Sequence, residues 1–533
     1  MIVKQKTGWL GLVKGIILST ATAALVSGCQ DLKDIQQLDP LKGVVFKINY
    51  EPAPTTLQGL VIDAKTVEPL KVPVQISIFG PDASRVITYE GLATTTFVSA
   101  KADLFIGLKG SIPSAAKPAE LRIVVDAPGY ISSSIYLFVD QAKPAPFEIR
   151  LVKETTTPSG VIVKQDVVET SATGNVKSNE SITTPIDASM ANHVTLSIPA
   201  GTQLKDVKGQ PVVGNLSTQV AAYSSQTEAA LRTFPGGFTT RIKGDDQGNA
   251  NVKGTFTTAG FVSIEIANSS SQKVTTFSQP VMVNVEVATS LINPETGQKI
   301  KSGDPIPVFS YAENTGEWTY ERDVAVKQEG SSLQVTIPIT HLSGYSLAFW
   351  TPSGTSCTAG GQWAITGKPD GKPVNWILYN GNQQYIANGS TSDNSIVFSQ
   401  LTSGAAQLNL FSPDGKLIGT STVNSICGNH TVSVTYPQNL VDLIVSVTAS
   451  CENKPDLQIS PSAWARYRKV GTSNWQQSFC TAGQGKLVGL EPSTDYEVGV
   501  DYNGFNSIVV NSGQTTSNKS IEIKLTNAIS ICQ

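Results

Sequence analysis

Apolar and polar residues alternate with a period of two along much of this chain. Val74, Ile76 and Ile78 are apolar, and the residues between them are polar. Similar alternation recurs at 194–198, 281–287 and 521–525. Successive side chains of a strand point to opposite faces, so this pattern predicts strands with one face on a core and the other in water.

Turn-forming residues separate these segments, for example at 235–237 (Pro-Gly-Gly), 369–371 and 413–415 (both Pro-Asp-Gly). Helical periodicity is nearly absent, and only 227–234 has room for a short helix. A chain of 533 residues is too long for one core. At a typical domain length of roughly 150 residues, we expect three to four domains. We therefore expect an all-β protein with several β-sandwich domains in tandem.

The first predicted domain spans 55–153. It begins with Gly-Leu-Val-Ile-Asp-Ala-Lys-Thr at 59–66 and later contains Ala-Pro-Gly-Tyr at 127–130 and an apolar strand at 147–151. These segments resemble a carboxypeptidase regulatory-like domain. The resemblance implies a seven-stranded transthyretin-like sandwich without enzymatic activity of its own. One departure is that the Asp-Gly turn of this family, before its Phe strand, is Ala102-Asp103 here.

The second predicted region, 154–352, is β-rich. Its segment 193–202 (HVTLSIPAGT) resembles the start of ZU5-like domains, and 306–318 with 340–343 (THLS) resembles the end of such a unit. The sequence leaves open whether this region forms one domain or two.

Two further modules are predicted, at 353–438 and 439–533. In the second, 490–496 (LEPSTDY) resembles the fibronectin type III pattern, which implies an immunoglobulin-like sandwich with a tyrosine corner at Tyr496. The segment 464–468 is expected to be its central strand. The first module has comparable turns without that signature, so its sandwich assignment depends on the alternation alone.

The amino-terminal segment resembles a bacterial lipoprotein signal. Three lysines precede an apolar run at 15–26, and Val-Ser-Gly at 26–28 comes directly before Cys29. The run is too short to span about 30 Å of hydrocarbon, but it suits a signal peptide. We expect removal of 1–28 and acylation of Cys29, because a thiolate is the nucleophile that accepts the lipid. Residues 29–54 are expected to be a tether with a first strand at 44–48.

The residue after the predicted lipid attachment is Gln30 rather than an aspartate that would favour inner-membrane retention, and acids follow it as in Bacteroidetes lipoproteins. We therefore expect an outer-membrane protein whose membrane contact is the acyl chains, palmitate among them. Whether it faces the periplasm or the cell surface stays open. The net charge of −3 gives no sign of the basic surface that nucleic-acid-binding proteins use.

Beyond Cys29, five cysteines lie in the last third, which indicates an oxidising compartment. The disulfide candidates are Cys357, Cys427, Cys451, Cys480 and Cys532. Because Cys357 and Cys427 lie near the two ends of one module, we expect them to pair. For the next module, both Cys451–Cys480 and Cys451–Cys532 remain open.

Candidate chemistry is sparse. His193, His341 and His430 lie far apart, and none has metal-ligand spacing. His341-Leu342-Ser343 is similar to the His-Phe-Ser motif of self-cleaving ZU5-type domains, in which the Ser hydroxyl attacks the preceding carbonyl and the His moves the proton. We expect a structural strand there instead, because Leu342 replaces the aromatic residue.

Two other features have an ordinary interpretation. The polar run 245–251 resembles a calcium loop only loosely, because the distal Glu that such loops require is missing, so we expect a hairpin turn. Aromatic residues that could stack on sugars are expected to be core residues; they are Trp363, Trp376, Tyr379, Tyr385 and Trp475.

We predict no catalytic residues, no metal and no cofactor. The preferred hypothesis is a non-catalytic cell-envelope lipoprotein whose sandwiches act as spacers and as binding modules for protein or glycan. The alternatives are a self-processing protein cleaved before Ser343 and a structural subunit of an envelope complex.

Overall fold

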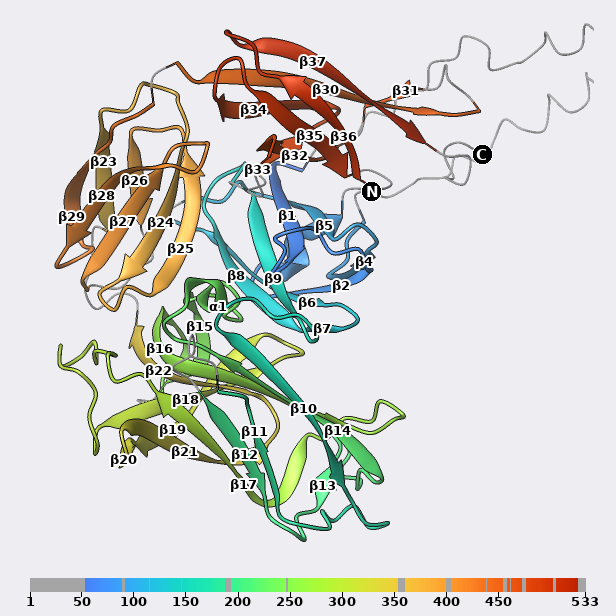
Figure 1. Ribbon diagram of the computed structural model, residues 1–533, viewed down its shortest axis with the longest axis vertical. Coiled ribbons are helices and arrows are strands. Elements are labelled where there is room, and N and C mark those ends of the chain that lie inside the picture. Colours follow the sequence, from blue (N-terminus) through green and yellow to red (C-terminus); the bar gives the residue numbers. More distant parts are fainter. Residues whose placement is uncertain are drawn as a thin grey trace, which may run out of the picture. The chain divides into compact units, whose positions relative to one another are not determined.

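The computed structural model describes residues 53–525, apart from short gaps at 89–91, 115, 145, 187–192, 246–247, 353–359, 399–403, 438, 454–457, 461, 472–475 and 502–504. The described part is almost entirely β-structure, as the alternation predicts (Figure 1). Its helical elements are the single turn α1 (Glu228–Leu231), inside the predicted segment 227–234, and the 3-10 turn η2 (Ala83–Arg85). The predicted signal peptide, Cys29, the tether and the strand at 44–48 lie outside the described residues.

The strands between 55 and 153 form two sheets of their own. They are β1 (Thr55–Asp63), β2 (Val74–Phe79), β3 (Val86–Thr88), β4 (Thr96–Ser99), β5 (Asp103–Leu108), β6 (Ala119–Asp126), β7 (Tyr130–Ile131), β8 (Ser133–Val139) and β9 (Phe147–Lys153). One sheet has the order β3-β5-β1-β9-β7 and the other has the order β4-β2-β6-β8. At the expected departure from the family turn, Ala102 adopts a φ of 58°, a left-handed conformation that Gly adopts at less cost.

The middle region contains the next strands. They are β10 (Val161–Glu169), β11 (Glu180–Thr183), β12 (Val194–Ile198), β13 (Leu204–Lys205), β14 (Asn215–Tyr223), β15 (Thr239–Gly244), β16 (Ala250–Ala267), β17 (Thr276–Val287), β18 (Pro305–Ala312), β19 (Glu317–Ala325), β20 (Lys327–Glu329), β21 (Ser332–His341) and β22 (Gly344–Pro352). One sheet has the order β10-β14-β16-β15-β19-β18-β22, and β22 also pairs with β16, which closes part of the sheet into a ring. The second sheet, β11-β12-β17-β21-β20, shares one hydrophobic core with the first. Strands from both ends of the region therefore contribute to a single core.

The third group has seven strands in two sheets. They are β23 (Gly361–Thr366), β24 (Val374–Asn380), β25 (Tyr385–Thr391), β26 (Ser395–Phe398), β27 (Ala406–Phe411), β28 (Leu417–Val423) and β29 (Gly428–Ser433). The sheet orders are β26-β23-β29 and β25-β24-β27-β28.

The last group forms two further sheets. Its strands are β30 (Val441–Cys451), β31 (Gln458–Ile459), β32 (Ala463–Lys469), β33 (Gln476–Cys480), β34 (Gln484–Leu490), β35 (Asp495–Asp501), β36 (Phe505–Asn511) and β37 (Ser517–Leu525). One sheet joins β31, β34 and β37 to β30, and the other has the order β33-β32-β35-β36. The predicted central strand at 464–468 is β32, which has a neighbour on each side.

The three smaller modules share one strand order. When the seven longer strands of each are numbered along the chain, the fourth, first and seventh form one sheet, and the third, second, fifth and sixth form the other. In each module the first and last strands pair in parallel: β1 with β9, β23 with β29, and β30 with β37.

This shared order corrects the fibronectin-type arrangement expected for 439–533. Immunoglobulin-like sandwiches are built from antiparallel sheets, whereas the first strand here, β30, pairs in parallel with the last, β37. The tyrosine corner is nevertheless present, because the backbone N–H of Glu491 donates to Tyr496 Oη at 3.0 Å. A local turn motif therefore identified the corner without determining the order of the strands.

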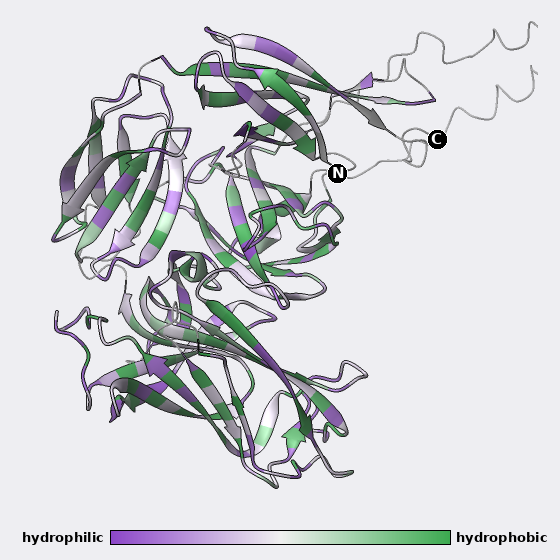
Figure 2. Ribbon diagram, in the orientation of Figure 1, coloured by the Kyte–Doolittle hydropathy of each residue, from purple (hydrophilic) through white to green (hydrophobic). Residues whose placement is uncertain are grey.

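Burial confirms the predicted alternation. Val74, Ile76 and Ile78 are at most 2 % exposed. The apolar residues of 194–198 and the four odd-numbered valines of 281–287 are equally buried. Figure 2 shows hydrophobic and hydrophilic residues alternating along many strands. The apolar faces pack between the two sheets of each group, which is where this pattern contributes most to stability.

Candidate functional site

His341 ends β21, next to the turn that contains Ser343. Its Nε2 lies 3.4 Å from Glu321 Oε1 on β19, and its Nδ1 lies 3.3 Å from Tyr345 Oη. The hydrogen bond to Glu321 raises the pKa of His341 above its ordinary value, although burial opposes the shift. Ser310 also donates to the Glu321 carboxylate, at 2.5 Å.

This arrangement engages both ring nitrogens of His341 with residues other than Ser343. The backbone of the same turn is also held, because Leu342 N donates to Thr275 O at 2.8 Å. A general base needs a free lone pair within hydrogen-bond reach of the proton that it takes. The geometry thus favours a structural role for His341. Sequence reasoning missed Glu321, since a partner on another strand leaves no local motif.

The other two histidines lie in separate places. His430 on β29 packs its ring 4.6 Å from that of Trp363, and His193 comes just before β12. Within the described ranges, no three His, Cys, Asp or Glu side chains are grouped so that they could hold a metal ion.

The polar run 245–251 forms the turn between β15 and β16. Both carboxylate oxygens of Asp245 accept hydrogen bonds from Asn249, at 2.7 Å from its backbone N–H and at 2.9 Å from its side chain. Asp246 and Gln247 lie outside the described residues. The bonds of Asp245 are those of a hairpin turn, as expected.

The cysteines require one correction. Cys480, a disulfide candidate, carries a free thiol and is fully buried on β33. Its sulfur fills the space above Gly485, and burial raises the pKa of the thiol to about 11. The alternative pairing Cys451–Cys480 is therefore wrong.

The remaining cysteine predictions stay open. Cys427 and Cys451 are each disulfide-bonded. Cys357 and Cys532 lie outside the described residues. The pairing Cys357–Cys427 thus stays a prediction, as does Cys451–Cys532.

The aromatic candidates separate into two kinds. Trp363 is fully buried in a core, as expected. Tyr379 is half-buried and donates to Glu228 Oε2 at 2.9 Å. Trp376 and Tyr385 are half-buried and pack against the same core, as expected, and both also line a groove. Trp475 lies outside the described residues.

This groove has a volume of about 860 Å³, and all four strand groups contribute to it. Its walls are formed by β8 and β9, by residues 231–239, by β24 and β25, and by β32, β33 and β34. Ten of the 35 lining residues are aromatic, and five of the ten are at most 6 % exposed: Tyr136, Phe234, Phe238, Trp464 and Tyr467. The other five are Phe138, Phe147, Trp376, Tyr385 and Phe411.

The charged residues of the groove already have partners. Arg232 bonds to Glu228 at 2.8 Å and lies 5.0 Å from the ring centre of Tyr385. Arg150 pairs with Glu148 at 3.0 Å. A volume of this size lies in the range of small-molecule sites, and polar and apolar atoms line the groove about equally.

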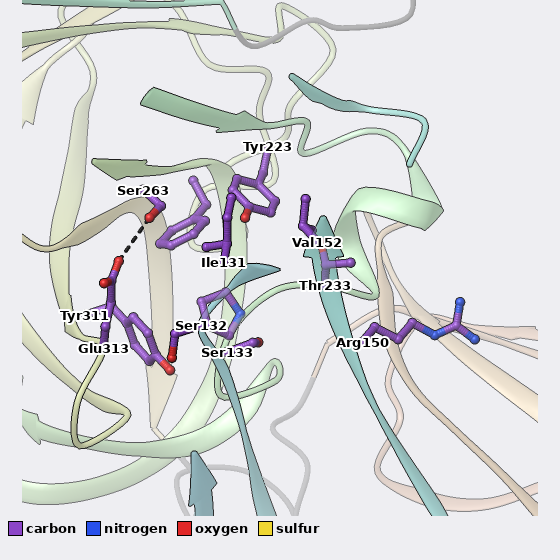
Figure 3. Close-up of a pocket in the computed structure, with 12 residues that line it drawn as sticks. Ile131, Ser132, Ser133, Arg150, Val152, Tyr223, Thr233, Ser263, Tyr311 and Glu313 are labelled. Atoms are coloured by element: carbon purple, nitrogen blue, oxygen red, sulfur yellow. Dashed lines mark hydrogen bonds between the residues drawn. The ribbon is translucent and has the colours of Figure 1, made fainter. Parts of the chain in front are cut away.

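A second, much smaller cavity of about 10 Å³ lies where β7 and β9 meet the middle region (Figure 3). The hydroxyl of Ser263 donates to Glu313 at 3.0 Å beside it, and burial raises the pKa of the Glu313 carboxyl. This space holds about one water molecule at most. It is a small void in a packed junction, too small for a substrate.

The described sandwiches define the chain as a tandem all-β protein, and comparisons with known proteins add little to that class. No family model matches the chain, and no curated protein matches it. No described helix is long and apolar enough to cross a membrane.

Solved structures with some similarity include two pilins and a putative cell adhesion protein. The major pilin subunit of Bacillus cereus is 9 % identical over 88 % of this chain and 98 % of its own, with a TM-score of 0.14. A streptococcal ancillary pilin is 10 % identical over 42 % and 93 %, also at 0.14. A putative cell adhesion protein from Bacteroides fragilis is 10 % identical over 30 % and 83 %, at 0.14. At TM-scores this low, the similarity supports no argument about this chain.

Proposed function

We propose that this chain is a non-catalytic cell-envelope lipoprotein, held in the outer membrane through Cys29, whose sandwich modules act together as a binding body. The observation that supports a binding function is the groove that all four strand groups line. Modules that served only as spacers would not need to converge on one aromatic-rich space.

Contacts between the modules support a fixed arrangement that preserves the shape of this groove. The ring of Phe105 in the first module stacks on Phe479 of the last, with ring centres 5.5 Å apart. Gln384 of the third module donates to Ser225 O at 3.0 Å and to Thr258 O at 2.6 Å in the middle region. Contacts of this kind pre-organise a site, which lowers the entropic cost of binding.

The anchor is tested by detergent phase partition. The wild-type chain should enter the detergent phase, because two or more acyl chains bind a membrane stably. Cys29→Ala should stay in the aqueous phase or keep residues 1–28 uncleaved. Ser27→Thr, which leaves the cysteine in place, serves as the control and should partition like the wild type. A wild-type chain that remains aqueous would exclude the lipid anchor.

A further inference from the structure

In each of the three small modules, the first and last strands form a parallel pair, which we call the terminal pair. β30 pairs along the whole of β37, from Leu443 beside Ser517 to Cys451 beside Leu525 (Figure 1). β23 pairs with the whole of β29, and β1 pairs with residues 147–151 of β9. The chain therefore enters each module on a strand that is hydrogen-bonded to the strand by which it leaves.

The terminal pair determines how a module responds when its two ends are pulled apart. In a parallel pair, the start of the first strand and the end of the last strand lie at opposite ends of the ladder. Tension then slides the two strands along each other. The hydrogen bonds of a parallel ladder are evenly spaced, so they share the load and must break together. The first strand also has a neighbour on its other side, β5, β26 or β34, and cannot separate alone.

Buried side chains oppose the same sliding motion in the last module. Leu443, Val445, Val447 and Ala449 of β30 are at most 1 % exposed, and Ile521 of β37 is 2 % exposed. A slip of one residue would turn such side chains from the core to the solvent face. The unfolding barrier under tension therefore includes both the ladder and the packing of the core, and this barrier governs forced unfolding.

The middle region has a different arrangement. Its first strand, β10, lies at the edge of its sheet, and β14 and β16 separate it from the last strand, β22. Each neighbouring pair in this row is antiparallel, so β10 and β22 run in opposite directions. The start of β10 and the end of β22 therefore lie toward the same end of the sheet. Tension between them acts across the strands and breaks the hydrogen bonds of β10 to β14 one after another.

We propose that the three small modules bear tension along the chain, and that the middle region unfolds before them when the chain is stretched. The proposal goes beyond the binding function proposed above, because it concerns resistance to force and needs no ligand. A chain held at both ends would keep its small modules folded while the middle region extends.

Single-molecule force spectroscopy tests this on the chain from residue 30 onward, which keeps every described residue, with a handle at each terminus. The length released at each step identifies the unit that unfolds. At about 3.5 Å per residue, 161–352 releases roughly 65 nm, and the first, third and last modules release roughly 35, 25 and 30 nm. A thiol reductant is present, because Cys427 and Cys451 are disulfide-bonded and a disulfide shortens the released length. We expect the longest step at the lowest force.

Double-proline variants connect the resistance to the terminal pair. Successive residues of a strand direct their N–H groups to opposite sides, so Lys519→Pro with Ser520→Pro removes one donor from β37 to β30. This variant should lose the high force of the step of roughly 30 nm. Ile508→Pro with Val509→Pro, in the edge strand β36 of the same module, is the matched control and should keep that force. All four side chains are exposed.

Two results would overturn the proposal. One is a longest step at a force equal to or above those of the three shorter steps. The other is an equal loss of force in the two double-proline variants. Thermal unfolding shows whether each variant folds, and if one does not, the order of the wild-type steps decides. No lipid or ligand takes part in the measurement, so a failure here leaves the proposed anchor and binding function standing.

Discussion

Two polar residues, the buried Lys368 and the half-buried His341, make hydrogen bonds that stabilise turns and strand ends in this protein. Lys368 is 7 % exposed, and its ammonium group donates to the carbonyls of Lys372 at 2.9 Å and Ser392 at 2.8 Å. His341 is similar, because Glu321 and Tyr345 engage its two ring nitrogens. A buried charge with its donors satisfied stabilises the local fold, whereas one left without partners would cost several kcal/mol.

Ser343 provides the prediction at this scale. We expect the purified chain to remain uncut between Leu342 and Ser343, because His341 has no ring nitrogen left to activate the hydroxyl. Wild type and Ser343→Ala should both run as a single band on a denaturing gel. Two fragments from wild type and one band from Ser343→Ala would show self-processing, with His341 as the general base.

At the scale of elements, each small module is closed by a parallel pair between its first and last strands. A parallel pair of this kind joins residues far apart in sequence, so the entropy of loop closure opposes it. In the third module β23 pairs with β29, next to Cys427. A covalent link near such a pair would reduce the entropy of the unfolded chain.

The predicted disulfide Cys357–Cys427 belongs to this scale. It would close a loop of roughly 70 residues and contribute about 3–4 kcal/mol to the free energy of unfolding. Peptide mapping without reduction should recover the two cysteines in one linked peptide, and Cys427→Ser should lower the melting temperature. Cys480→Ser should not alter the map, since Cys480 carries a free thiol. Recovery of Cys427 with another partner would refute the pairing.

For the molecule as a whole, charged hydrogen bonds connect the first module to the middle region. Arg241 on β15 contacts both carboxylate oxygens of Glu120 on β6, at 2.5 and 2.7 Å, and Tyr136 donates to the same carboxylate at 2.7 Å. Nearby, Tyr311 Oη donates to Ser134 Oγ at 2.7 Å. Bidentate hydrogen bonds between an arginine and a carboxylate are stronger than ordinary surface ion pairs.

Glu120 makes this junction sensitive to acid. Burial raises the pKa of Glu120, but the bonds from Arg241 and Tyr136 outweigh this effect, so that the pKa of the carboxyl lies below its ordinary value. Because the folded pKa is below the unfolded one, the carboxylate stabilises the fold fully at neutral pH. That contribution is lost as the pH falls below about 4.5 through the folded pKa.

Thermal unfolding of Glu120→Gln tests this. At pH 7 the variant should lose roughly 1–2 kcal/mol of stability, since hydrogen bonds to a charged group are lost or weakened. Between pH 5 and 3 the melting temperature should fall less steeply than that of wild type. Glu169→Gln removes an exposed ion pair with Lys177 and should change little. Parallel pH curves for wild type and Glu120→Gln would contradict the assignment.

The sequence alone determined the all-β fold class, because alternation such as that of Val74, Ile76 and Ile78 is a local property of strands. It also located the corner at Tyr496 and the turn after Asp245, where the residues that bond lie within five positions of each other. These features depend on neighbouring residues, so one sequence is enough to predict them.

Tertiary structure decided how distant segments meet. The common strand order of the three small modules, the partner Glu321 of His341 and the groove beside Trp376 all join residues from separate strands. Strand pairing between remote segments leaves no spacing in the sequence, because many pairings bury the same alternating apolar face. Whether an aromatic residue lies wholly in a core, like Trp363, or also lines a groove, like Tyr385, depends on what the other modules place against it.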